Sequence, residues 1–283
     1  MTIDRESRSK VTLRGVPLDV NSSYLRGPAE APAAIRKAMY AGCSNLWTED
    51  GLDLGLPDTF HDLGDVRFSG DGRTAFERVE QAAANILQSR LPLISFGGDH
   101  SVTFPILKAF HAVYPDLTIL HFDAHPDLYD QLDGNRESHA SPFARIMESG
   151  LARRLVQVGI RTLNAHQLEQ AKRWNVEMVT MRDLGKFQGI RLEGPLYISF
   201  DVDVLDPAFA PGISHYEPGG MSVRELLAMI QSIDVYIVGA DIVEYNPVRD
   251  REGQTAMVCV KILKELTAAI RRGGKVAATE HWR

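Results

Sequence analysis

The sequence is poor in cysteine, since Cys43 and Cys259 are the only two among 283 residues. Two cysteines are too few for a disulfide framework, and neither stands at the spacing of a zinc-binding pair. This scarcity excludes a small disulfide-stabilised secreted fold, and we expect the protein to work in a reducing compartment.

Long apolar segments and an excess of positive charge are also absent. No run of 18 apolar residues occurs, so no membrane-spanning helix is expected. The first residues, Met1–Glu6, lack the apolar stretch of a signal peptide. A net charge of −6 argues against a nucleic-acid partner. We therefore predict a cytoplasmic protein that binds neither membranes nor nucleic acids.

Short apolar runs alternate with longer segments of helical periodicity along most of the chain. The strand-like runs are Val11–Leu13 with Val16, Leu91–Phe96, Leu117–Phe122, Leu155–Ile160, Leu196–Phe200 and Val235–Ala240. The helix-like segments include Thr74–Gln88, Ser141–Ser149, Asn164–Trp174, Val223–Gln231 and Thr255–Arg272. This alternation predicts crossover units whose parallel strands form one sheet with helices on both faces.

Several of these apolar runs are continuous, as in strands that are buried on both faces. The Gly- and Asp-rich stretch Asp50–Phe60 is short enough to be a loop, and no repeat or linker divides the chain. We therefore predict a single domain over residues 1–283. Its fold class is α/β, with three layers (αβα) around a central, mostly parallel sheet.

Carboxylate and imidazole side chains follow four of the strand-like runs. The segments are Gly97-Gly98-Asp99-His100, Asp123-Ala124-His125-Pro126-Asp127, Asp201-Val202-Asp203 and Glu244. Open parallel sheets bind ligands outside the carboxyl ends of their strands, so these distant segments are expected to converge on one crevice. Unpaired charges are costly at such depth, and bound cations are the simplest explanation of the cluster.

Six of these side chains have the chemistry and spacing of metal ligands. They are His100, Asp123, His125, Asp127, Asp201 and Asp203. Oxygen and imidazole donors without sulfur favour Mn²⁺, with Ni²⁺, Co²⁺ or Zn²⁺ as substitutes. Six ligands are too many for one ion that keeps a position open for water. We therefore predict two ions and a binuclear metallohydrolase.

Other polar residues near these motifs are interpreted as structural. Asp99 is expected to serve a turn or to support the ligands, and Asp241 to be structural or to lie behind Glu244. The histidines interpreted as ordinary helix, strand or surface residues are His111, His121 and His166. His215 and Tyr216 lie in a loop that either contacts the substrate tail or packs against the protein.

At these residues the sequence resembles the ureohydrolase family, which contains arginases, agmatinases and related guanidino hydrolases. The matching signatures are Gly97–Ser101, Asp123–Asp127 and Ser199–Gly212. Further stretches resemble plant-type arginases, namely Gly15–Pro17, Asn21–Ser23, Ser138–Ser141, Phe143–Glu148 and Val243–Pro247. The resemblance extends from Leu13 to Arg271 and implies the arginase-like fold.

The resemblance also implies how the ligands are shared. One Mn²⁺ would be held by His100, Asp123, Asp127 and Asp201, and the other by Asp123, His125, Asp201 and Asp203. Water activated between the ions would attack the guanidinium carbon and release urea and an amine. Asp127 would pass a proton to the leaving amine.

Two residues outside the ligand set complete the implied catalytic site. Glu244 resembles the guanidinium-binding glutamate of the family, and a carboxylate can accept the planar guanidinium in a bidentate manner. His139 resembles the proton-shuttling histidine, whose ordinary pKa of about 6.5 suits exchange with water. Asp127, His139 and Glu244 are therefore the catalytic candidates.

L-arginine differs from agmatine by one α-carboxylate. Animal and bacillar arginases have a carboxylate-binding asparagine at the position of Tyr129. Agmatinases tend to have a tyrosine there, as this sequence does. Ala140 follows His139 where both groups usually have glycine. Plant-type arginases share the tyrosine and the Ser-His-Ala sequence, so both substrates stay open at this point.

The candidate substrate-binding residues are Asn135, Ser138, His139 and Glu244, of which Asn135 and Ser138 could donate hydrogen bonds to an α-carboxylate. We predict an arginase that converts L-arginine to L-ornithine and urea. An agmatinase that makes putrescine, or another guanidino-acid hydrolase, is the alternative.

Two alternatives of another kind are a non-catalytic metal-binding regulatory subunit and a deacetylase on a related sheet. The first would be expected to lack a ligand, whereas all are present here. The second typically keeps a single zinc. The resemblance further implies a homo-oligomer, either a trimer or a hexamer.

Overall fold

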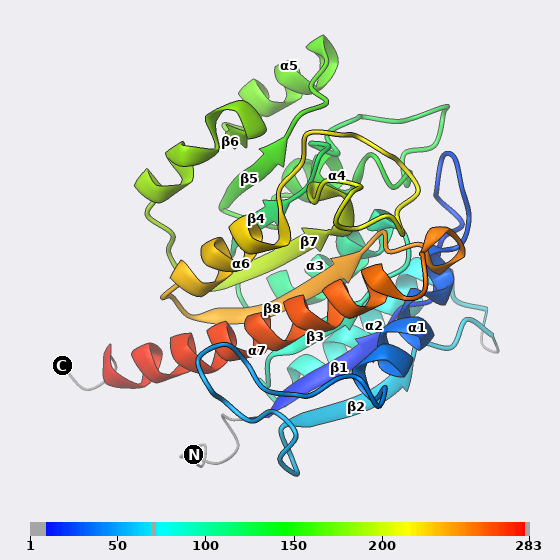
Figure 1. The fold of residues 1–283 in the computed structure, drawn as a ribbon. Helices are drawn as coiled ribbons and strands as arrows, with labels where there is room; N and C mark the ends of the chain where they lie inside the picture. The colour runs from blue at the N-terminus through cyan, green and yellow to red at the C-terminus, as the bar shows by residue number, and fades with distance from the viewer. Residues whose placement is uncertain (1–9, 70–71, 281–283) are drawn as a thin grey trace.

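The computed structural model describes residues 10–69 and 72–280 and contains one eight-stranded sheet (Figure 1). Across the sheet, the strands are β2 (Phe60–Asp65), β1 (Val11–Gly15), β3 (Leu93–Phe96), β8 (Ile237–Val243), β7 (Leu196–Asp201), β4 (Thr118–Phe122), β5 (Arg154–Ile160) and β6 (Glu177–Thr180). All neighbouring pairs are parallel. The predicted α/β class is confirmed, and the described sheet is wholly parallel.

Helices cover both faces of this sheet (Figure 1). One face carries α1 (Ala31–Met39), α6 (Val223–Ser232) and α7 (Gln254–Glu280). The other carries α2 (Ala75–Leu87), α3 (Thr103–His111), α4 (Pro142–Glu148) and α5 (Ala165–Arg173). Short 3-10 helices are η2 (Pro28–Glu30), η3 (His100–Val102), η4 (Met181–Gly189), η5 (Val202–Val204) and η6 (Pro247–Arg249). Among the described residues, no helix is long and apolar enough to cross a membrane.

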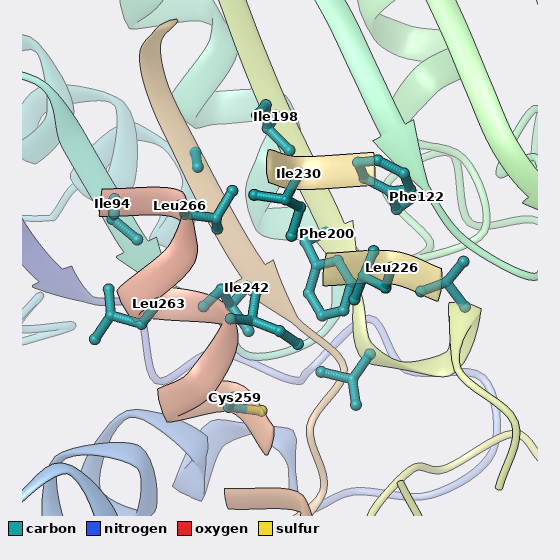
Figure 2. Close-up of a cluster of buried hydrophobic side chains, with 14 of the residues drawn as sticks. Ile94, Phe122, Ile198, Phe200, Leu226, Ile230, Ile242, Cys259, Leu263 and Leu266 are labelled. Atoms are coloured by element: carbon teal, nitrogen blue, oxygen red, sulfur yellow. The ribbon is translucent and has the colours of Figure 1, made fainter. Parts of the chain in front are cut away.

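The core on the first face is built from strands of the sheet and from helices α1, α6 and α7. Figure 2 shows Ile198 and Phe200 of β7 beside Leu226 and Ile230 of α6, with Leu263 of α7 nearby. All five side chains are fully buried. Because both faces of the central strands are covered, their sequences are continuously apolar, which made them recognisable from sequence.

The two edge strands were missed by the sequence analysis. β2 begins at Phe60, inside the predicted loop Asp50–Phe60, and much of it is exposed. β6 has only four residues. Edge strands bury little surface, so neither has the long apolar run that identified the central strands.

Helices α1 and α3 were also absent from the predicted segments, and each contains a proline. Pro32 lies in the first turn of α1, and Pro105 is the third residue of α3. A proline in the first turn removes no helical hydrogen bond, so the fold tolerates both. The predicted absence of a signal peptide at Met1–Glu6 lies outside the described residues.

The Gly97-Gly98 pair brings two segments close together. A Cβ atom at Gly98 would lie 1.8 Å from the backbone oxygen of Leu18. The amide of Asp99 donates to that same oxygen at 3.0 Å. Glycine is therefore required for close backbone approach, which ties the loop after β1 to the loop that carries His100.

Candidate metal centre and active site

The carboxyl ends of four neighbouring strands carry the polar residues predicted from the sequence. β3, β8, β7 and β4 are consecutive in the sheet. His100 follows β3, Glu244 follows β8, Asp201 and Asp203 lie at the end of β7, and Asp123, His125 and Asp127 follow β4. Parallel strands direct these ends to one edge, so the predicted convergence on one crevice occurs.

The imidazole of His100 is the centre of one ligand cluster. Its Nδ1 atom lies 3.2 Å from Asp123 Oδ2 and 3.1 Å from both Asp127 Oδ2 and Asp201 Oδ2. The ring is fully buried, and Nδ1 has no hydrogen-bond partner among the described residues. A buried nitrogen that faces three carboxylate oxygens without a hydrogen bond suits a ligand set around a cation.

A second cluster lies beside the first. His125 Nδ1 is 3.0 Å from Asp203 Oδ2 and 3.4 Å from Asp123 Oδ1. The three side chains form a group compact enough to hold an ion. Asp123 contacts both histidines and thus connects the two clusters. Oxygen and nitrogen donors on both sides of one carboxylate suit a pair of divalent cations.

The carboxylates of these clusters disfavour one another's charge. Burial and the charge of Asp123 raise the pKa of Asp127 to about 6. Burial, with the charges of Asp203 and Asp123, raises the pKa of Asp201 well above its usual range. Divalent cations would neutralise this buried repulsion. The residues present therefore fit the metal pair that the sequence predicts.

His121 of β4 belongs to this site, although the sequence analysis interpreted it as an ordinary strand histidine. Its Nε2 lies 2.7 Å from Asp123 Oδ2, and its Nδ1 lies 3.0 Å from Gln157 Nε2. Burial lowers its pKa to about 4, so the ring is neutral. Since Gln157 donates to Nδ1, the proton lies on Nε2 and is donated to Asp123. The position of His121 two residues before Asp123 was the available signal.

A buried hydrogen-bond chain supports His100 from behind. Ser199 Oγ lies 3.0 Å from His100 Nε2 and donates to Asp241 Oδ1 at 2.8 Å. Asp241 also accepts from the hydroxyls of Thr103 and Tyr197. These hydrogen bonds explain why the Asp241 carboxylate is tolerated inside β8. The predicted strand Val235–Ala240 ended one residue before Asp241. The structural role expected for Asp241 matches these contacts.

Glu244 and His139 form a buried pair next to the ligand clusters. His139 Nδ1 lies 2.7 Å from Glu244 Oε1, and the backbone amide of His100 donates to the same oxygen at 2.9 Å. Glu244 has a positive φ of 63°, which turns the chain sharply after β8. Burial opposes its ionisation, but the His139 ring and these hydrogen bonds keep its pKa below the usual value.

A cavity of about 460 Å³ opens at this edge of the sheet. Its lining includes the ligand candidates His125, Asp127, Asp201 and Asp203, together with His139 and Glu244. The rest of its wall includes Ser23, Tyr129, Leu132, Arg161, Asn164, Gln167 and His215. The volume is that of a small-molecule site.

Asn135 and Ser138, which are predicted to bind substrate, are not among the residues that line this cavity. Asn135 Nδ2 donates to Asn21 Oδ1 at 3.2 Å, and Ser138 Oγ accepts from the Ala140 amide at 3.3 Å. Asn135 is thus bonded to the loop after β1, and Ser138 to its own loop. Tyr129 does line the cavity.

Asp99 and the loop after β7 are also placed by the structure. Asp99 caps η3 and accepts from the amide of Asn21, as expected of a turn residue. His215 lines the cavity, with its ring centroid 5.2 Å from that of His139. Tyr216 instead donates to Pro211 and lies under the Arg249 guanidinium.

The fold and the site together define a class of protein, a parallel α/β protein with a carboxylate–imidazole centre for divalent cations at its sheet edge. The chain belongs to the arginase family, whose model matches residues 9–269. The ureohydrolase resemblance found in the sequence is therefore confirmed.

Individual relatives include both arginases and agmatinases. "Arginase 1, mitochondrial" of Arabidopsis thaliana is 46% identical over 280 residues, which cover 93% of this chain and 82% of the relative. The solved arginase from Medicago truncatula has a TM-score of 0.88 and 42% identity, covering 93% of this chain and 88% of that chain. An agmatinase of Bacillus subtilis (strain 168) is 34% identical over 265 residues, covering 90% and 89%.

Family membership fixes the general chemistry. Enzymes of the arginase family are metal-dependent hydrolases that cleave the guanidino C–N bond of small substrates. This chain is accordingly a hydrolase of that kind, and its buried His and Asp clusters supply groups that could hold metal.

Proposed function

We propose that this chain is an arginase, which hydrolyses L-arginine to L-ornithine and urea. The observation that carries the proposal is the Glu244 carboxylate, buried beside the ligand clusters at the wall of the cavity. The greater identity to plant arginases than to agmatinases supports arginine as the substrate.

The metal ligands are proposed to be His100, Asp123, His125, Asp127, Asp201 and Asp203, with two Mn²⁺ per chain. Bound divalent cations would supply the acidity that makes water a nucleophile near neutral pH. Glu244 would accept the substrate guanidinium in a bidentate manner and hold its carbon near the clusters. Binding the guanidinium in this way would orient its carbon for attack by water.

Proton transfer is assigned to two residues. Asp127 lies at the cavity wall, where its carboxylate would accept a proton from water and pass it to the leaving amine. His139 would exchange protons between this region and solvent. Both side chains are buried, so neither has direct contact with bulk water over most of its surface.

Urea release from L-arginine and agmatine, side by side at equal concentration with Mn²⁺-loaded protein, tests this proposal. We expect L-arginine to dominate. A preference for agmatine above about tenfold in kcat/KM, about 1.4 kcal/mol, would instead make the chain an agmatinase. Urea from neither substrate would favour another guanidino acid as the substrate.

Glu244→Gln is the matched variant for that assay. It keeps the size of the side chain but removes the charge that faces the guanidinium. We expect kcat/KM to fall about 100-fold, because a charge-assisted pair is lost, with bound metal unchanged. Unchanged kcat/KM would remove Glu244 from the proposed site.

Three further properties belong to the same proposal. Residues 1–283 form one ureohydrolase domain, the enzyme is a trimer or hexamer, and it is cytoplasmic. Light scattering that shows a monomer would contradict the assembly. The plant relatives are named as mitochondrial or chloroplastic proteins, so cell fractionation is the test of the compartment.

A further inference from the structure

The ring of His139 is buried between two different kinds of partner. Its Nδ1 edge faces Glu244, as described above. Its Nε2 edge faces Ser23, whose backbone nitrogen lies at 3.2 Å and whose Oγ lies at 2.8 Å. His139 is 8% exposed, whereas Ser23 is exposed and lines the cavity. Ser23 therefore occupies the Nε2 edge of the ring, and its own exposed side borders the cavity.

The Ser23 amide determines where the neutral ring carries its proton. A backbone N–H can only donate, so Nε2 must accept from it. The remaining proton then lies on Nδ1 and is donated to Glu244. The Ser23 hydroxyl differs from the amide because it can either donate or accept. It is thus able to hydrogen-bond the ring in both protonation states.

The segment that carries Ser23 is held firmly against the ring. Asp99 Oδ2 accepts from the Asn21 amide at 3.0 Å. The His139 amide donates to the backbone oxygen of Asn21 at 3.2 Å. These contacts join the loop after β1 to the loops after β3 and β4, so the three loops together place the hydroxyl of Ser23.

We propose that Ser23 positions His139 and relays its proton to the cavity solvent. The protonated ring gives its Nε2 proton to Ser23 Oγ as the hydroxyl hydrogen passes to a cavity water. The ring is left neutral with its Nδ1 proton toward Glu244, and the hydroxyl is regenerated. The reverse sequence reprotonates the ring. This inference rests on the proposed function, since it assumes that His139 exchanges protons during turnover.

Three variants in one loop test the relay. Ser23→Ala removes the hydroxyl and keeps the amide, Ser23→Thr keeps both, and Ser22→Ala removes a neighbouring hydroxyl that contacts Asp99. We expect Ser23→Ala to lower kcat about tenfold in dilute buffer with KM within about twofold, because one proton-transfer step is slowed. Small imidazole buffers should restore the rate. Ser23→Thr and Ser22→Ala should retain it.

Two results would overturn the relay in a protein that releases urea. The first is a kcat of Ser23→Ala equal to that of Ser22→Ala. The second is a loss of kcat in Ser23→Ala that added imidazole buffer does not restore, since a merely structural defect is insensitive to buffer.

A second readout keeps this inference distinct from the proposed function. In the metal-free protein labelled with ¹⁵N in its histidine rings, Ser23→Ala should shift the Nε2 resonance of His139, and Ser22→Ala should not. An unshifted resonance overturns the Ser23 contact whatever the activity. No urea from the wild type, with the shift observed, overturns the proposed function and leaves Ser23 as a positioning contact.

Discussion

At the scale of single residues, the site depends on charges that are buried in pairs and groups. Asp123 contacts His100, His121 and His125, and so lies where both ligand clusters and a supporting histidine meet. If a neutral group replaced this carboxylate, the ring nitrogens of all three histidines would lose a charged partner and their contacts would have to change. The same dependence links Glu244 to His139.

The Glu244–His139 pair predicts a measurable pKa change. Burial disfavours the charged ring, but Glu244 outweighs it and raises the pKa of His139 to about 9. Removing the negative charge destabilises the protonated ring, so Glu244→Gln should lower this pKa toward about 6.5. Histidine NMR titration of the metal-free protein measures it.

Glu137→Gln is the control for that titration. Glu137 is exposed and lies two residues from His139 in sequence. We expect the control to leave the pKa of His139 near its wild-type value. A pKa that stays near 9 in Glu244→Gln would show that Glu244 is not what stabilises the charged ring.

At the scale of elements, loops are joined to helices by charged networks outside the active site. The Glu49 carboxylate accepts from both terminal nitrogens of Arg224 on α6, at 2.7 and 2.8 Å, and from Gln231 at 3.0 Å. The Glu49 amide donates to Glu265 of α7 at 3.0 Å. One residue thus fastens the loop after α1 to two helices.

This network predicts a pH-dependent stability difference. Hydrogen bonds from Arg224 and Gln231 lower the pKa of Glu49 far below its usual value. A lowered folded-state pKa contributes stability above the unfolded pKa of about 4.3 and loses it as pH falls. Glu49→Gln should therefore lower the Tm by about 1–3 °C at pH 7, with a smaller difference below pH of about 4.

Differential scanning calorimetry at several pH values measures this effect. Glu193→Gln is the matched control, because Glu193 pairs with Arg153 on the surface and both side chains are about half exposed. Its Tm should stay at the wild-type value. If the Tm difference between the wild type and Glu49→Gln became larger at low pH, the role assigned to the Glu49 carboxylate would be contradicted.

At the scale of the whole molecule, four central strands carry one acidic site. β3, β8, β7 and β4 each deliver side chains to the same sheet edge. Because these strands also form the buried core, the geometry of the site and the stability of the fold depend on the same packing. Repulsion among the buried carboxylates opposes that packing until cations neutralise it.

Metal removal should therefore destabilise the entire protein. Chelation followed by reloading with Mn²⁺ should raise the Tm by about 5–10 °C, since ions at 100 times their Kd add about 2.7 kcal/mol per site. Elemental analysis should find about two ions per chain. Asp123→Asn should abolish the rise, whereas Asp116→Asn, at an exposed position, should keep it. One ion per chain would contradict the proposed metal pair.

Much of the fold and of the candidate site could be predicted from the sequence because the signals are local. Continuous apolar runs identified the central strands, and the pattern of Asp123, His125 and Asp127 lies within five residues. Edge strands β2 and β6 carry no such signal, since little of their surface is buried. The end of β8 was missed because three hydroxyls satisfy Asp241 only in the folded protein.

The sequence by itself determined the class of the fold, the family and the residue types of the metal centre. Only the tertiary structure decided which groups face one another. Ser23 and His139 are 116 residues apart, and Glu244 and His139 are 105 apart. Such contacts depend on strand order and loop packing, which join distant segments through long-range burial rather than local preference.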